Sequence, residues 1–68
     1  MTFHECCTKV LVWCNNGYAK AYAEAGLAMT DSYEIKVQAM YIVGNIAGWR
    51  GDMAKAVRTE LKLIGGMK

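Results

Sequence analysis

The sequence predicts an all-α fold of three or four short helices packed as stacked antiparallel hairpins, in a single domain spanning residues 1–68. Apolar residues recur at intervals of three and four along most of the chain, the spacing that places them on one face of an α-helix. The chain holds no proline, so no helix interior loses an amide donor to a clashing ring. Two capping signatures and an alanine-rich stretch favour the same fold class.

The first helix is expected to begin at Thr2, because Thr2 and Glu5 have the spacing of a capping box. Its predicted inward face consists of Phe3, Cys7, Val10 and Cys14. Asn15-Asn16-Gly17 is expected to stop or kink this helix, since asparagine and glycine tolerate the left-handed conformation of a helix end. The alternative is one long helix that continues to Met29, because an interior glycine costs only about 1 kcal/mol.

The second helical segment runs from Tyr18 to Met29 and contains five alanines. Its predicted inward stripe consists of Tyr18, Tyr22, Ala25 and Met29. So much alanine predicts a thin helix, which lets a neighbouring helix approach closely.

The third segment begins with Asp31 and Glu34, which repeat the capping arrangement. Its inward stripe is predicted to hold Ile35, Ala39, Ile42, Ile46 and Trp49. Further apolar residues make the helix apolar nearly all round, so residues 32–49 are expected at the centre of the fold. Gly44 and Gly48 are expected to let another helix pack against its backbone.

The last helix is expected to start at Gly51-Asp52 and to end at Gly65-Gly66, before a tail of Met67-Lys68. Ala54, Val57, Leu61 and Ile64 are predicted to face inward, and Lys55, Arg58 and Lys62 to face outward. The spacing of each set corresponds to one face of a helix.

Length and composition limit the classes of protein to which the chain can belong. A chain of 68 residues buries only about 60% of its unfolded surface, so a second subunit is expected to stabilise it. No apolar run approaches the roughly 20 residues that span a bilayer, and charged residues interrupt the amino terminus where a signal peptide would be apolar. We therefore expect an intracellular, soluble protein that does not contact the membrane.

Three cysteines, Cys6, Cys7 and Cys14, lie in the first predicted helix. Their odd number argues against a closed disulfide framework. We expect them to be reduced and buried as small apolar side chains.

The net charge of +2 is unevenly placed along the chain. Residues 1–34 carry a formal charge of −2 and residues 35–68 carry +4. An anionic partner would therefore be bound by the second half.

The second half has the layout of a tetratricopeptide repeat: a helix, a Gly-Asp corner and another helix. The residues that resemble the signature of that family are Gly44, Gly51, Asp52 and Ala56. The family has a period of about 34 residues, and a shift of that length pairs Gly17 with Gly51 and Leu27 with Leu61. This resemblance implies two degenerate helical hairpins.

A tract within residues 41–61 resembles a family of small, mostly uncharacterised proteins encoded by bacteriophages and prophages. The residues that carry the resemblance are Tyr41, Asn45, Trp49-Arg50-Gly51, Ala54-Lys55, Val57-Arg58 and Leu61. It implies a virus-encoded accessory protein acting in a bacterial cytoplasm. The family offers no known active site to transfer.

His4 and Cys7 have the spacing of two metal ligands on one helix, but a structural zinc site needs four ligands. One straight helix cannot supply four, so packed thiols are expected, and a metal shared across a dimer is the alternative. The same residues lack the orienting group and oxyanion site of a Cys-His nucleophile pair. We therefore expect no catalytic residue, metal or cofactor, and a protein that is not an enzyme.

Residues 43–62 have some features of a DNA-reading helix-turn-helix, because Ala47, Gly51 and Val57 fall at suitable offsets. The stripe of Lys55, Arg58 and Lys62 offers phosphate contacts, which give affinity without sequence choice. A small nucleic-acid-binding regulator that uses helix 52–64 is therefore the alternative function.

Trp49-Arg50 is the leading contact site, because tryptophan and arginine are enriched among the residues that dominate interface energetics. Trp49 also extends the inward stripe of its helix, so covering the core is its other expected role. The predicted function is a non-enzymatic accessory protein that binds a host or viral protein as a homodimer. Its predicted binding residues are Trp49, Arg50, Lys55, Arg58 and Lys62.

Overall fold

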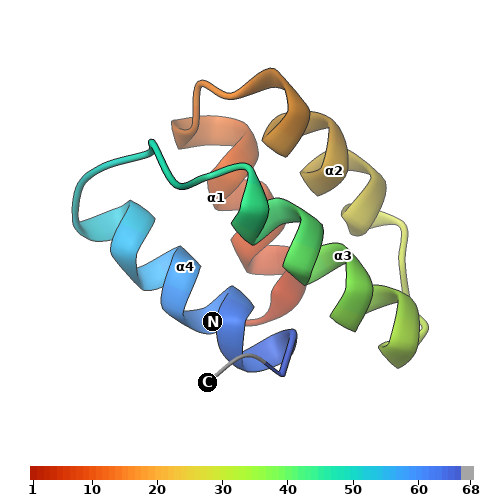
Figure 1. Ribbon diagram of the computed structural model, residues 1–68. Coiled ribbons are helices and arrows are strands. Elements are labelled where there is room, and N and C mark those ends of the chain that lie inside the picture. Colours follow the sequence, from red (N-terminus) through yellow and green to blue (C-terminus); the bar gives the residue numbers. More distant parts are fainter. Residues whose placement is uncertain (67–68) are drawn as a thin grey trace.

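The computed structural model describes residues 1–66 and places four α-helices, and no strand, in that part of the chain (Figure 1). The helices are α1 (Phe3–Trp13), α2 (Gly17–Leu27), α3 (Ser32–Gly44) and α4 (Asp52–Ile64). The prediction of an all-α fold is confirmed. The predicted tail, Met67-Lys68, lies outside the described residues. Within residues 1–66, no helix combines the length and apolar character that crossing a bilayer would require.

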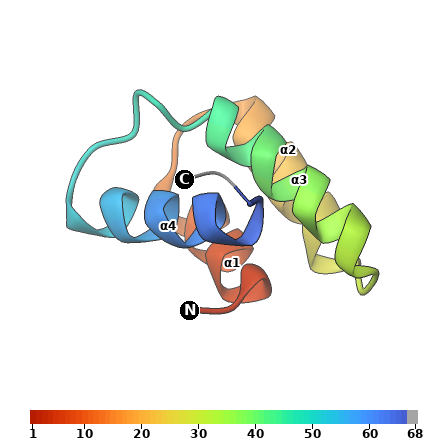
Figure 2. The ribbon, with the colours of Figure 1, turned by 60° about the horizontal axis from the view of Figure 1, so that its bottom comes forward.

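The helices form a ring of neighbours around one core (Figures 1 and 2). Helix α1 packs mainly against α2 and α4, and α3 packs against the same two helices. The expectation that residues 32–49 form the centre is wrong. Helix α3 ends at Gly44, and its outer side chains Met40 and Tyr41 are about half exposed, at 45% and 53%. In α3, the apolar residues on one side of the helix lie in the core, and those on the other side are exposed to solvent.

Helix α1 begins and faces the core as predicted. The Thr2 hydroxyl accepts a hydrogen bond from the Glu5 amide at 3.1 Å, and the Thr2 amide donates to the Glu5 carboxylate at 2.8 Å. The four residues of the predicted inward face are buried, and Cys6 joins them. The hydrogen bonds between Glu5 and Thr2 hold the pKa of the Glu5 carboxyl below its ordinary value.

The chain turns between α1 and α2, so the alternative of one helix running to Met29 is wrong. The turn does not use a left-handed residue. Cys14 and Asn16 both have extended backbone conformations, and the Asn16 side chain accepts a hydrogen bond from the Ala19 amide at 2.9 Å. Asn16 thus separates the helices by capping the start of α2.

The predicted inward stripe of α2 is wrong. Its buried residues are Ala19, Ala23 and Gly26, whereas Tyr18 is 74% exposed. A Cβ atom on Gly26 would lie 2.8 Å from Phe3 Cζ and 2.9 Å from Cys7 Sγ. Because α1 and α2 approach this closely, only small residues fit between them. The expectation of a thin helix is confirmed, but the tyrosines face away from that contact.

Helix α3 is capped as predicted, with the Asp31 carboxylate accepting from the Glu34 amide at 2.9 Å. It ends at Gly44 and not at Trp49, and residues 45–51 form an irregular connection to α4. A Cβ on Gly44 or Gly48 would meet nothing within 4 Å, so neither glycine serves a close helix contact within this chain. Within one copy of the chain, the expectation that another helix packs against these two glycines is therefore wrong.

Helix α4 begins after Gly51 and ends before Gly65, as predicted. Ala54, Val57 and Leu61 are completely buried. Gly51 precedes the helix with φ of 108°, a conformation that side chains rarely adopt, so glycine is required at this position.

Candidate interaction site at the two interhelical corners

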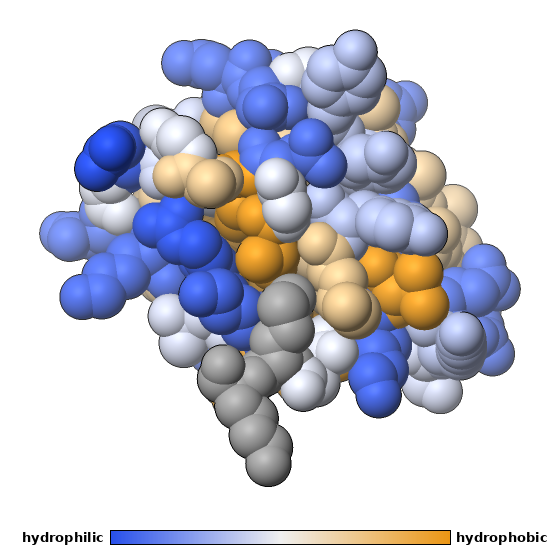
Figure 3. Space-filling model, in the orientation of Figure 1, coloured by the Kyte–Doolittle hydropathy of each residue, from blue (hydrophilic) through white to orange (hydrophobic). Residues whose placement is uncertain are grey.

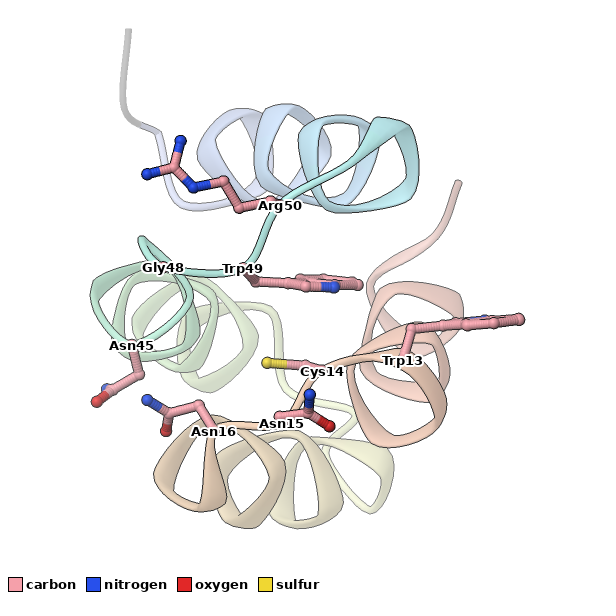
Figure 4. Close-up of a pocket in the computed structure, with 8 residues that line it drawn as sticks. All are labelled: Trp13, Cys14, Asn15, Asn16, Asn45, Gly48, Trp49 and Arg50. Carbon is pink, nitrogen blue, oxygen red and sulfur yellow. The ribbon is translucent and has the colours of Figure 1, made fainter.

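The two corners that join α1 to α2 and α3 to α4 lie beside each other and enclose a surface cavity of about 520 Å³ (Figure 4). We call this cavity the corner groove. Its eight lining residues are Trp13, Cys14, Asn15, Asn16, Asn45, Gly48, Trp49 and Arg50. They belong to two segments that are about thirty residues apart in the sequence and are brought together by the ring of helices.

The α1–α2 side of the groove is rigid because both flanking residues are held. The Cys14 amide donates to the Val10 carbonyl at 3.0 Å, and the Cys14 side chain is buried. Asn16 uses its side-chain oxygen to cap α2, which leaves its amide NH₂ as the polar group available to a ligand. Asn15, between them, is exposed.

The α3–α4 side is held by side chains that bind backbone carbonyls. The Asn45 side-chain NH₂ donates to the Tyr41 carbonyl at 2.8 Å. The Arg58 guanidinium donates from one nitrogen to the Ile46 carbonyl at 3.1 Å and the Trp49 carbonyl at 3.2 Å. Arg58 therefore attaches this connection to α4 just before Arg50.

Trp49 and Arg50 extend from the connection in different directions (Figure 4). The Trp49 ring reaches toward α1 above Cys14, and it packs against the hydrophobic core while remaining partly exposed. The expected role of Trp49 in covering the core is confirmed. Arg50 points to the other side and is exposed. Trp49 thus gives the groove an apolar side chain held against the core, and Arg50 gives it an exposed positive charge.

The predicted binding residues do not form one surface. Trp49 and Arg50 line the corner groove, whereas Lys55, Arg58 and Lys62 lie along α4 and do not line it. Lys55 and Lys62 are exposed as predicted. The prediction that Arg58 faces outward is wrong, because its charge is used on two carbonyls of the connection.

The spacing of α3 and α4 differs from that of a helix-turn-helix. That motif joins its helices by a turn of about three to four residues, whereas residues 45–51 separate α3 from α4. With Arg58 engaged as well, the basic face of α4 is left with Lys55 and Lys62.

Four residues that line the groove were not predicted from the sequence as groups that contact a ligand: Trp13, Asn15, Asn16 and Asn45. Trp13 is 59% exposed, and its ring extends outward from the end of α1 (Figure 4). One signal was present in the sequence: each tryptophan stands within a few residues of a glycine at the start of the next helix, Gly17 as the first residue of α2 or Gly51 directly before α4.

The residues considered for metal binding or catalysis have structural roles. The His4 Nε2 atom lies 2.7 Å from the Met29 carbonyl and ties the start of α1 to the α2–α3 connection. Burial raises the pKa of both Cys6 and Cys7 to about 11, so both thiols stay protonated at neutral pH. Within residues 1–66, no three histidine, cysteine or acidic side chains are grouped closely enough to hold a metal ion.

The chain matches no protein-family model and no curated protein, and its fold matches no solved structure.

Proposed function

We propose that this protein is a non-enzymatic, phage-encoded accessory protein that binds a host or viral protein through the corner groove, and that it acts as a homodimer. The observation that carries the proposal is the composition of the groove. Two tryptophans and an exposed arginine surround one cavity, and none of its eight lining residues is acidic. The phage origin rests on the resemblance of the tract that contains Trp49-Arg50-Gly51.

The groove has the chemistry of a protein contact. Tryptophan and arginine are the side chains most enriched among residues that dominate binding energy. Arg50 and the Asn16 NH₂ group supply hydrogen-bond donors, whereas the Asn45 carbonyl oxygen supplies an acceptor, because its NH₂ is already bonded. A partner segment that presents a carboxylate beside an apolar side chain would match this arrangement.

The rigidity of the two corners supports the same conclusion. Ordering a loop on binding costs free energy, so a surface that is already ordered binds more tightly for the same contacts. The Asn16 cap and the Arg58 bonds order the two sides before any partner arrives.

Nucleic-acid binding through α4 is the competing function, and two observations weigh against it. Arg58 is engaged with backbone carbonyls, and the connection from α3 is long for a helix-turn-helix. Lys55 and Lys62 alone offer few phosphate contacts, and the affinity of such binding depends on their number.

Site-specific photo-crosslinking in bacterial cells tests the proposal. A photoreactive amino acid replaces Asn15, which lines the groove, or Leu27, which is 42% exposed on α2 and does not line it. We expect one discrete protein adduct from position 15, lost when Arg50→Glu is added, and no such adduct from position 27. Equal labelling from both positions, or adducts to nucleic acid alone, would refute the proposed function.

A further inference from the structure

Helix α3 carries two apolar stripes, and the core uses only one of them. The inward stripe follows Ile35, Ala39 and Ile42. The second, which we call the outer stripe, consists of Tyr33, Val37, Met40 and Gly44. It is displaced from the first by two residues, which is about 200° around a helix, so it faces the opposite side.

The outer stripe is a ridge with a hollow on each side. A cavity of about 580 Å³ is lined by Ser32, Tyr33, Lys36, Val37, Met40 and Ile64. A second cavity of about 260 Å³ is lined by Met29, Tyr33, Glu34, Val37 and Gln38. The two share Tyr33 and Val37, and apolar atoms are visible along this face of the molecule (Figure 3). A ridge between two hollows is the shape that packs against another helix.

The spacing of the outer stripe makes it complementary to itself. Its intervals of four, three and four residues are those of a seam between two paired helices. If a two-fold axis passes between Val37 and Met40 of antiparallel α3 helices, Tyr33 of one copy lies opposite Gly44 of the other. A Cβ on Gly44 would meet nothing within 4 Å, so this end has room for a tyrosine ring.

The one cation among the residues that line the larger hollow is drawn away from the stripe. A Cβ on Gly66 would lie 3.5 Å from Lys36 Nζ, so the Lys36 ammonium lies beside the carboxyl end of α4. The negative end of a helix dipole favours a cation at that place. Lys36 therefore leaves the centre of the outer stripe without a charge.

The exposed area is sufficient for a dimer of the smaller kind. Tyr33 and Met40 of the stripe are 66% and 45% exposed, and Tyr41, which borders the stripe on α3, is 53% exposed. Because a large side chain carries on the order of 200 Å², these three offer on the order of 300 Å² per copy. With the exposed residues Ser32, Glu34 and Lys36 that line the two hollows, a pair buries on the order of 1,000 Å², at the small end of specific interfaces.

We propose that a second copy of this chain occupies the outer face of α3, in an antiparallel α3–α3 pair related by a two-fold axis. This inference rests on the homodimer of the proposed function. It shares no lining residue with the corner groove, so the interface and the groove can be tested separately.

Cysteine pairing tests the register of the interface. Tyr33→Cys and Gly44→Cys are prepared as separate variants, mixed and oxidised. We expect a disulfide-linked heterodimer from the mixture and little crosslinking of either variant alone, because each position lies about 16 Å along the helix axis from its own copy. The three native thiols are buried and remain silent. Equal crosslinking of single variants and mixture would overturn the antiparallel register.

Sedimentation at micromolar concentrations tests whether this face mediates the dimer. We expect Met40→Glu to weaken self-association tenfold or more, and Tyr33→Glu to do the same. Tyr18→Glu, on a residue of α2 that is even more exposed than Tyr33 and Met40, should leave self-association unchanged. Circular dichroism checks that each variant keeps its helices. A wild-type monomer, or a folded dimer in both α3 variants, would overturn the inference. If a monomeric variant still forms the protein adduct from position 15, the proposed binding function of the corner groove is supported although the dimer is lost.

Discussion

At the scale of single residues, Arg58 has the spacing of a solvent-exposed basic residue but serves as a hydrogen-bond donor inside the structure. Its position three residues after Lys55 indicates a basic stripe, but its guanidinium binds the carbonyls of Ile46 and Trp49. The Ile46 carbonyl also accepts a hydrogen bond from the Trp49 amide at 3.0 Å, so the guanidinium reinforces that turn and binds the Trp49 carbonyl at the same time. Arg58 is therefore a positioning residue for the corner groove.

Replacing Arg58 should loosen this corner. We expect Arg58→Ala to lower the free energy of unfolding by about 1.5–3 kcal/mol, the range for hydrogen bonds to a charged group. Chemical denaturation measures the loss, and tryptophan fluorescence should shift as Trp49 becomes more exposed. Lys55→Ala, on the exposed face of the same helix, should change stability by no more than about 0.5 kcal/mol. Equal stability of the two variants would contradict the anchoring role.

At the scale of helices, the contact between α1 and α2 depends on the absence of side-chain volume. Ala19, Ala23 and Gly26 bring α2 against Phe3 and Cys7. The displaced tyrosines then find other positions, and Tyr22 stacks on Tyr41 of α3 with ring centroids 5.6 Å apart. The Gln38 side chain of α3 also donates to the Tyr22 carbonyl at 2.7 Å, which links α2 to α3.

Adding one methyl group to this contact should destabilise the protein. Alanine favours a helix over glycine by about 1 kcal/mol, but overpacking costs about 1–3 kcal/mol. Since the Phe3 ring and the Cys7 sulfur are buried and have little room to move, we expect Gly26→Ala to lower the thermal midpoint by several degrees.

Gly17→Ala is the matched control, because a Cβ at the start of α2 meets nothing within 4 Å. Its thermal midpoint should stay the same or rise. If Gly26→Ala were as stable as Gly17→Ala, the two helices would not be in the close contact described.

At the scale of the whole molecule, half of the buried core residues are alanines or cysteines. Three buried cysteines share the core with alanines and a few larger aliphatic residues. Little volume is therefore enclosed, while many large apolar residues remain on the surface, among them Trp13, Tyr18 and Tyr33. A small core combined with apolar surface is the condition under which subunit contacts contribute to stability.

The buried thiols make stability sensitive to high pH. Burial raises the pKa of Cys6 and Cys7 from 9.0 to about 11. As the pH rises, the unfolded chain loses these protons first, so stability should fall between about pH 9 and pH 11. Denaturant unfolding at several pH values measures this slope, and Cys6→Ala should reduce it. A slope that is the same in the variant would contradict the assignment to the thiols.

The parts of the candidate site that lie within one segment of the chain could be predicted from the sequence, and the parts that depend on contact between distant segments could not. Trp49 and Arg50 adjoin a glycine corner, and their composition alone indicates a contact site. Trp13 and Asn15 could not be assigned to it, because nothing in the sequence shows that the α1–α2 corner lies beside the α3–α4 corner. Arg58 was misplaced for a related reason: its partners are carbonyls nine and twelve residues away, beyond the reach of helical spacing.

Local sequence is enough to place the starts of α1 and α3, since the caps at Thr2 and Asp31 are bonds between residues three apart. The inward faces of α1 and α4 also follow from local sequence, because their predicted apolar residues recur at helical spacing on one side. Which face of α2 is buried depends on tertiary structure, because it is set by how near α1 approaches. The corner groove also depends on tertiary structure, because it forms only where two distant segments meet. The outer stripe of α3 depends on it as well, because the closed ring of helices leaves that face uncovered.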